Sequence, residues 1–121
     1  MDHKTTIYEL KEKIKSFCDA RDWDQFHNAK DLAIGIVTEA SELLEHFRFQ
    51  SEEQVIEMLN NSKKRKELTE EMADVFYFLI RMAQKYNIDL TTELINKLEK
   101  NNLKYSVEKS KGSNKKYTEF E

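Results

Sequence analysis

The sequence predicts an all-α fold, an antiparallel helical bundle of about four main helices and one short helix. Its 121 residues include no proline and only two glycines, so the chain lacks the residues that sheets and frequent tight turns require. Apolar residues, 39% of the chain, recur at helical spacing. A chain of this length closes one core. We therefore expect a single domain over residues 1–109 and a polar, flexible tail over residues 110–121.

Charge and cysteine content exclude several functional classes. Lys and Arg total 20 against 23 Asp and Glu, so the formal net charge is -3 and no basic excess is available for binding nucleic acid. The single cysteine, Cys18, permits neither an intramolecular disulfide nor a thiolate metal cage. No apolar run has the length of a membrane span, and the first ten residues lack the apolar segment of a signal peptide. We expect a cytoplasmic protein that binds neither nucleic acid nor membranes.

Apolar periodicity predicts the first two main helices. A stripe that starts at Ile7 indicates a helix ending near Arg21. Residues 22–28 break the period and form an ordered loop, which ends at Asn28, a favourable N-cap residue. Helix formers continue over residues 30–49 with apolar side chains on more than half of the circumference. We expect this second helix to be largely buried.

Three further helices follow along the chain. A Ser-x-x-Gln motif at residues 51–54 has the spacing of a capping box and starts a short helix that stops at residues 60–61. The next helix begins near residue 62, and its segment 72–83 is apolar on nearly every side, which predicts the core helix of the bundle. A last helix covers residues 91–105.

Four acidic residues lie within the apolar stretches of two predicted helices. Glu39 and Glu42 are three residues apart and share one face, and Glu71 and Asp74 repeat this spacing after the 28 residues 43–70. Burying clustered, unpaired carboxylates is costly, and the cations of these two helices lie mostly at the helix ends. We therefore predict that the four acids bind a divalent metal ion.

The ligand types narrow the choice of metal. Oxygen ligands without cysteine or a spaced histidine favour a hard ion, Mg²⁺ or alternatively Mn²⁺, over zinc. A di-iron bundle requires Glu-x-x-His, but the residue three positions before His46 is Leu43. No histidine directly precedes an aspartate, so the sequence also lacks the His-Asp pair of that class of phosphohydrolases.

The acid spacing and its flanking motifs resemble the MazG-like all-α nucleoside triphosphate pyrophosphohydrolases, most closely the dCTP pyrophosphatase branch. The flanking motifs are Trp-Asp-Gln-Phe-His at residues 23–27, Glu-Met-Ala-Asp-Val at 71–75 and Val-Glu-Lys-Ser-Lys-Gly at 107–112. The resemblance covers about residues 5–112. It implies Mg²⁺-dependent cleavage of a triphosphate such as dCTP to the monophosphate and pyrophosphate, with the four acids as metal-binding and catalytic residues. The alternative is a non-enzymatic helical interaction module whose acids pair with residues 63–66 of another chain.

The resemblance also implies residues that bind the substrate. Lys97, Asn101 and Tyr105 match the last-helix motif of the branch and share one helix face. His27, in the aromatic loop, can donate a hydrogen bond to a phosphate or a base, or alternatively cap the following helix through its ring nitrogen. Phe49 stands where the branch has the tryptophan on which the base packs.

Surplus apolar surface predicts self-association. The apolar stretches 32–47 and 72–83 exceed what about four helices can cover within one chain. Closed symmetric assembly covers such a face without open-ended aggregation. The family resemblance implies dimers or tetramers. We expect a homo-oligomer, a tetramer in preference to a dimer, with the nucleotide at a subunit boundary.

Overall fold

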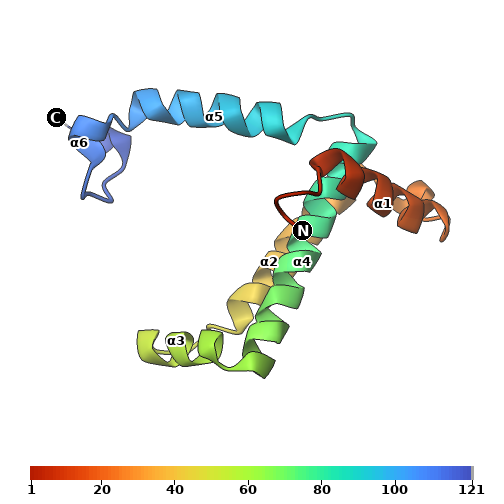
Figure 1. Ribbon diagram of the computed structural model, residues 1–121, viewed down its shortest axis with the longest axis horizontal. Helices are drawn as coiled ribbons and strands as arrows, with labels where there is room; N and C mark the ends of the chain where they lie inside the picture. The colour runs from red at the N-terminus through yellow and green to blue at the C-terminus, as the bar shows by residue number, and fades with distance from the viewer. Residues whose placement is uncertain (121) are drawn as a thin grey trace. The chain divides into compact units, whose positions relative to one another are not determined.

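The computed structural model describes residues 1–120, which form helices joined by short connections (Figure 1). The α-helices are α1 (Ile7–Asp19), α2 (Ala29–Glu45), α3 (Glu52–Asn60), α4 (Ser62–Lys85), α5 (Leu90–Lys104) and α6 (Val107–Ser110), and the 3-10 helices are η1 (Asp24–Phe26) and η2 (Tyr117–Glu119). Residues 1–120 contain no strand, which confirms the predicted all-α class. None of their helices combines the length and apolar composition needed to cross a bilayer. The chain divides into two units, Met1–Ile88 and Asp89–Glu121.

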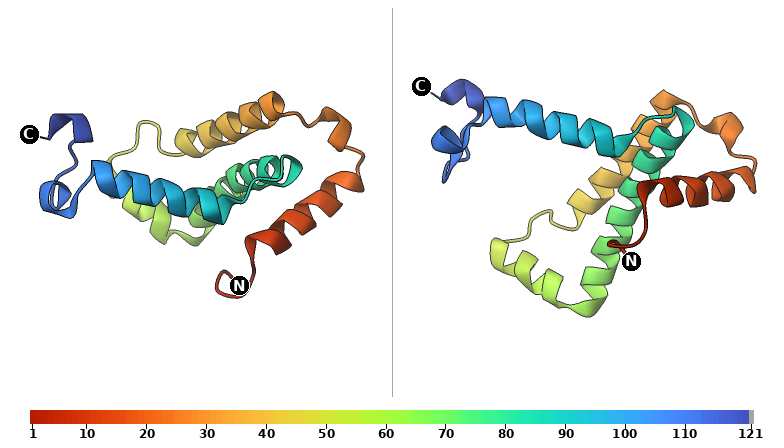
Figure 2. Two further views of the ribbon diagram at one scale, coloured as in Figure 1. Left: turned by 90° about the horizontal axis from the view of Figure 1, so that it is seen from above. Right: turned by 45° about the horizontal axis from the view of Figure 1, so that its top comes forward.

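Helix α4 lies at the centre of the first unit, between α1 and α2 (Figure 2). It runs antiparallel to α2, and these two helices make the most extensive contact in the chain. On α1, the Sγ of Cys18 lies 3.3 Å from the Oη of Tyr77 on α4. The buried apolar side chains of this core come from α1, α2 and α4, and they are Cys18, Leu32, Leu68, Ile80 and Ala83.

The close approach of α2 and α4 depends on Gly35. A Cβ added at this position would lie 2.6 Å from a ring carbon of Phe78, far inside van der Waals contact. Glycine within a helix is intrinsically unfavourable by up to ~1 kcal/mol relative to alanine, so helix propensity does not explain its presence. The missing side chain instead lets the two helices that carry the acids pack closely together.

The starts of the helices follow the predicted capping chemistry. Oδ1 of Asn28 accepts a hydrogen bond from the backbone N–H of Asp31 at 2.8 Å, at the start of α2. Ser51 and Gln54 make both hydrogen bonds of the predicted capping box, at 3.2 and 2.8 Å. Each interaction satisfies an N–H group that has no partner within its own helix.

Helix α2 ends earlier than the sequence predicted, at Glu45 and not at residue 49. Helix α1 ends at Asp19, within two residues of the predicted end near Arg21. The chain leaves α2 through turns that finish at Phe49, whose φ of 61° lies in the left-handed region. Since neither glycine nor proline marks this exit, the residue pattern did not locate it.

The predicted burial of the two apolar helices is wrong within a single chain. Val37 and Leu44 on α2 are 65% and 68% exposed, and Ile34, Met72 and Phe76 are also exposed. Helix α2 packs mainly against α4, and one neighbouring helix covers only part of a helix circumference. An apolar face on α2 and α4 is therefore open to solvent.

The second unit contains α5, α6 and η2. Its main helix lies within one residue of the predicted segment at each end, and Oδ1 of Asp89 caps it by accepting from the N–H of Thr92 at 2.9 Å. The ring of Tyr105 lies 5.9 Å from each of the rings of Tyr117 and Phe120, in edge-on contacts. The segment after residue 110 thus contains a short helical turn and aromatic contacts that its polar composition did not indicate.

Candidate active site

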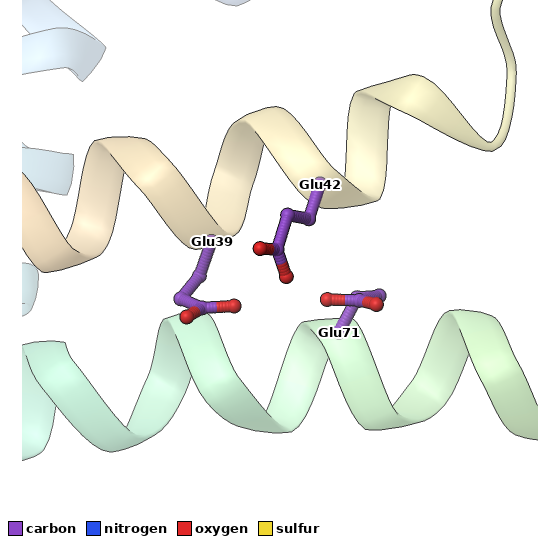
Figure 3. Close-up of side chains that lie close together, drawn as sticks. All are labelled: Glu39, Glu42 and Glu71. Atoms are coloured by element: carbon purple, nitrogen blue, oxygen red, sulfur yellow. The ribbon is translucent and has the colours of Figure 1, made fainter.

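Three of the four predicted acids meet between α2 and α4. One carboxylate oxygen from each of Glu39, Glu42 and Glu71 lies within 4.8 Å of the others. Figure 3 shows the three side chains directed into the space between the two helices. The spacing of three residues places both glutamates of α2 on the face toward α4, and the contact at Gly35 brings that face close. We call these three residues the acid cluster.

The acid cluster brings three carboxylates together, and the part of the chain that the structure describes does not supply a hydrogen-bond partner for every buried oxygen. Burial, the hydrogen bond with Glu42 and the charges of Glu42, Asp74 and Glu71 raise the pKa of Glu39 to about 7. The Oε2 atoms of Glu39 and Glu71 are buried and have no hydrogen-bond partner within residues 1–120. Asp74 is exposed and lies outside the group of three, although its charge acts on Glu39. Unpaired carboxylate oxygens at such a position fit a hard divalent cation.

His46 borders the acid cluster, and sequence reasoning missed it. Its Nε2 lies 3.6 Å from Oε1 of Glu71. Together with Glu42, Glu45 and Glu71, it lines a small pocket beside the cluster. The spacing of four residues between Glu42 and His46 could have identified this neighbour, because it places both side chains on one face of the chain leaving α2.

A second polar cluster, the Arg81 network, joins the loop before α2 to the C-terminal half of α4. Arg81 is 1% exposed, and its Nε and Nη2 donate to Nδ1 of His27 at 2.9 Å and to Oδ1 of Asp24 at 2.8 Å. Its Nη1 donates to Gln84. The Nζ of Lys85 donates to the backbone oxygens of Asp24, at 2.8 Å, and of His27. These contacts hold the predicted ordered loop against a helix that lies more than 50 residues further along the sequence.

The other predicted substrate-binding residues lie in different parts of the chain. Phe49 is 89% exposed, and the guanidinium of Arg48 lies 4.8 Å from the centre of its ring. Lys97 and Asn101 lie on α5, and Tyr105 follows at its C-terminus, all within the second unit. Their spacing of four residues gives these three one helix face. His27, Phe49 and the four acids belong to the first unit.

Comparisons with known proteins identify the family of this chain. The MazG-like family model matches residues 34–120. The chain is 33% identical to dCTP pyrophosphatase 1 of Rattus norvegicus over 115 residues, which cover 95% of this chain and 68% of that protein. The identity to the Homo sapiens protein of the same name is 29% over the same shares. A pyrophosphatase from Archaeoglobus fulgidus, known as a crystal structure, superposes with a TM-score of 0.77 at 34% identity, over 83% of this chain and 92% of that chain. The chain belongs to the MazG-like family.

Proposed function

We propose that this chain, a nucleoside triphosphate pyrophosphatase, requires Mg²⁺ and hydrolyses a (deoxy)nucleoside triphosphate such as dCTP to the monophosphate and pyrophosphate. The observation that carries the proposal is the acid cluster, with its two unpaired carboxylate oxygens on Glu39 and Glu71. The rat and human relatives, each named dCTP pyrophosphatase 1, support dCTP as the substrate. Such an enzyme removes unwanted or excess nucleotides, and we assign this role to the cytoplasm.

The residues of the acid cluster fit Mg²⁺ by charge and by ligand type. Carboxylate oxygens are the ligands that Mg²⁺ takes most readily from proteins, and Mn²⁺ shares this preference and can substitute. Glu39, Glu42 and Glu71 would hold the ion, and the exposed carboxylate of Asp74 offers a fourth ligand. When bound, such an ion neutralises phosphate oxygens and lowers the pKa of a coordinated water.

We assign the nucleotide contacts to five residues outside the acid cluster. Lys97 carries the positive charge that phosphate oxygens require, and Asn101 and Tyr105 supply polar groups on the same helix face. His27 offers a ring N–H group. The exposed ring of Phe49 suits stacking against a base, although it gives a smaller surface than tryptophan.

We further propose a homo-oligomer, a tetramer in preference to a dimer, with the nucleotide at a subunit boundary. The support is the open apolar face of α2 and α4, where a broad hollow is lined by residues that include Leu43, Met72, Phe76 and Leu79. A second copy can cover this face through a symmetric contact. Size-exclusion chromatography with light scattering should give about four times the 14.5 kDa chain mass. A stable, active monomer would contradict the assembly.

The non-enzymatic interaction module has less support. That alternative requires the four cations at residues 63–66, three lysines and Arg65, to pair with acids of another chain. Within α4, however, the Nζ of Lys64 lies 3.5 Å from Glu67 and the Nζ of Lys66 lies 3.8 Å from Glu70. Lys64 and Lys66, two of these four cations, therefore already have acidic partners one turn away.

A substrate panel tests the proposed reaction. The purified chain is incubated with each common nucleoside triphosphate and Mg²⁺, and the products are separated by ion exchange. We expect monophosphate and pyrophosphate, formed fastest from dCTP. A Glu42→Gln chain purified in parallel controls for contaminating hydrolases. Orthophosphate with a nucleoside diphosphate would overturn the cleavage position, and the lack of metal-dependent turnover for every triphosphate would overturn the function.

A further inference from the structure

We propose that Arg81 is a positioning residue, which fixes His27 as a neutral ring with its hydrogen on Nε2, so that this N–H donates to an acceptor oxygen of the nucleotide. The state of the ring follows from the Arg81 network alone. Only the contact with a nucleotide rests on the proposed function. Arg81 itself touches neither the acid cluster nor, in this proposal, the substrate.

The hydrogen bond between the two side chains determines the tautomer. A guanidinium group has donors and no acceptor, so the Nδ1 of His27, 2.9 Å from the Nε of Arg81, must accept and carries no hydrogen. A neutral imidazole has one N–H, which therefore lies on Nε2. Protonation of Nδ1 would place two N–H groups against each other and break the contact.

The charges around His27 also favour the neutral ring. The side chain is half-buried, and two cations, Arg81 and Lys85, face it together with one anion, Asp24. Burial lowers the pKa of His27 first, the two cations lower it further, and Asp24 opposes them. Near neutral pH the ring is thus an uncharged donor, and the acceptors it suits are a base carbonyl oxygen or a phosphate oxygen.

The same contacts tie His27 to the helix that carries two of the four acids. Arg81 follows Asp74 by seven residues, or two turns, so both lie on one side of α4 and are separated by about 10 Å along the helix. Arg81 makes the hydrogen bond to the ring, whereas Asp24 and Lys85 anchor the loop without touching the imidazole. The ring of Trp23, with its centroid 6.3 Å from that of His27, is a neighbour that forms no hydrogen bond with the imidazole. Loss of Arg81 should therefore disturb the ring more than the loop.

Nuclear magnetic resonance of chains with ¹⁵N-labelled histidine rings reads the tautomer directly. In the wild type we expect His27 to show one tautomer, with hydrogen on Nε2, and the signals are assigned by their loss in His27→Gln. In Arg81→Met we expect a mixture of tautomers and a pKa that moves back toward 6.5, the ordinary value. Lys85→Met is the matched control and should keep the single tautomer. A single Nε2–H tautomer in Arg81→Met would overturn the assignment.

Kinetics test the contact with the nucleotide. Arg81→Met should raise the KM for dCTP roughly 3- to 10-fold, the effect of one neutral hydrogen bond, with kcat changed less than about 2-fold. The double variant Arg81→Met/His27→Gln should have a KM for dCTP no higher than that of His27→Gln alone, because both changes remove the same contact. An unchanged KM in Arg81→Met would overturn the proposed contact between His27 and the nucleotide. A double variant whose loss equals the sum of the two single losses in free energy would overturn it as well. If Arg81→Met does not fold by circular dichroism, Arg81→Gln replaces it in both measurements, since an amide offers both a donor and an acceptor and so does not fix the tautomer of His27.

A comparison of dCTP with dATP distinguishes a base carbonyl oxygen from a phosphate oxygen as the acceptor, because adenine has no carbonyl oxygen. A KM increase for dCTP but not for dATP supports a base carbonyl, and an equal increase for both supports a phosphate oxygen. Failure of the proposed function is distinguishable from failure of this inference. A wild-type chain that releases no pyrophosphate from any triphosphate overturns the former, while the tautomer measurement still decides the role of Arg81.

Discussion

The two polar clusters of α4 differ in whether the protein completes them. The guanidinium of Arg81 is buried, yet it donates to an anion, an amide and a neutral ring. Earlier on the same helix, Glu71 meets two further carboxylates, and two buried oxygens of this cluster have no partner within residues 1–120. At Arg81, this fold satisfies a buried charge with its own side chains. The cluster that it leaves unsatisfied is therefore the better candidate for a ligand that supplies charge from outside.

Removing a carboxylate should have the largest effect, on activity. We expect Glu42→Gln and Asp74→Asn each to lower turnover by at least ~10²-fold, because each removes a proposed metal ligand, while circular dichroism stays unchanged. Glu70→Gln is the matched control, since Glu70 precedes Glu71 but pairs with Lys66 at 3.8 Å. Near wild-type pyrophosphate release at saturating Mg²⁺ would remove the substituted acid from the ligand set. The Asp74→Asn result decides more, because Asp74 lies outside the group of three carboxylates and only this variant tests whether it is a ligand.

Mg²⁺ should complete the acid cluster and stabilise the fold. At a concentration 100 times Kd, binding adds about 2.7 kcal/mol to the free energy of unfolding, which for a domain of this size raises Tm on the order of 10 °C. Differential scanning fluorimetry with and without Mg²⁺ measures the shift. Glu39→Gln should lose most of this Tm shift. Lys85→Met, which changes the Arg81 network and leaves the acid cluster intact, should keep the shift. Equal shifts in all three chains would place the ion elsewhere.

Gly35→Ala tests whether the acid cluster depends on the close approach of its two helices. The added Cβ meets the ring of Phe78 at 2.6 Å, so we expect a loss of about 1–3 kcal/mol in the free energy of unfolding, partly offset by the better helix propensity of alanine. Turnover should fall as well, because the two helices move apart at the acids. Chemical denaturation and pyrophosphate release check both effects. Combining the change with Phe78→Leu should recover part of each loss, and full stability of Gly35→Ala alone would refute the packing argument.

The smallest expected effect is a pH dependence of the metal-free chain. Because the pKa of Glu39 rises from 4.5 to about 7 on folding, the folded state binds the proton more tightly, and this residue makes stability fall as pH rises from 4.5 to 7. His27 has the opposite sign: its lowered pKa makes stability fall as pH drops below 6.5. Urea denaturation with a chelator, at pH 5.5 and 8, should therefore show a larger decrease with pH in the wild type than in Glu39→Gln. Identical pH profiles would show that Glu39 does not titrate in this range.

The sequence predicted those structural features that depend only on residues close together in the chain. The capping box at Ser51 and Gln54 is made within four residues, so its sequence spacing was enough to locate the start of α3. The end of α2 could not be located in this way, because its cap residue, His46, is right-handed and the left-handed residue that finishes the following turns is Phe49, a type that seldom adopts this conformation. Burial was overestimated for a different reason. Apolar periodicity shows that a face avoids water, but it does not show whether the same chain or another copy covers that face.

The candidate site was also predictable only in part, because some of its residues stand out from their neighbours in the sequence and others are brought together by packing. Glu39, Glu42 and Glu71 were found because charges within apolar helices conflict with their surroundings, and the structure brings them together. Arg81 lies between Ile80 and Met82 and raises the same conflict, so it could have been identified as a buried cation. Its partners could not have been, since Asp24 and His27 lie 57 and 54 residues away and only the packing of the loop on α4 joins them.

Cys18 gives this chain a built-in reporter of local motion. It is the only cysteine, it is fully buried, and its sulfur lies beside the hydroxyl of Tyr77, where α1 meets α4. A thiol reagent can reach it only when α1 separates from α4, so the rate of modification measures how often that helix opens under native conditions. With no second thiol to label, this rate can be followed in an unaltered chain while metal or nucleotide is added. The rates measured with and without metal or nucleotide then test whether binding between α2 and α4 slows the opening of α1.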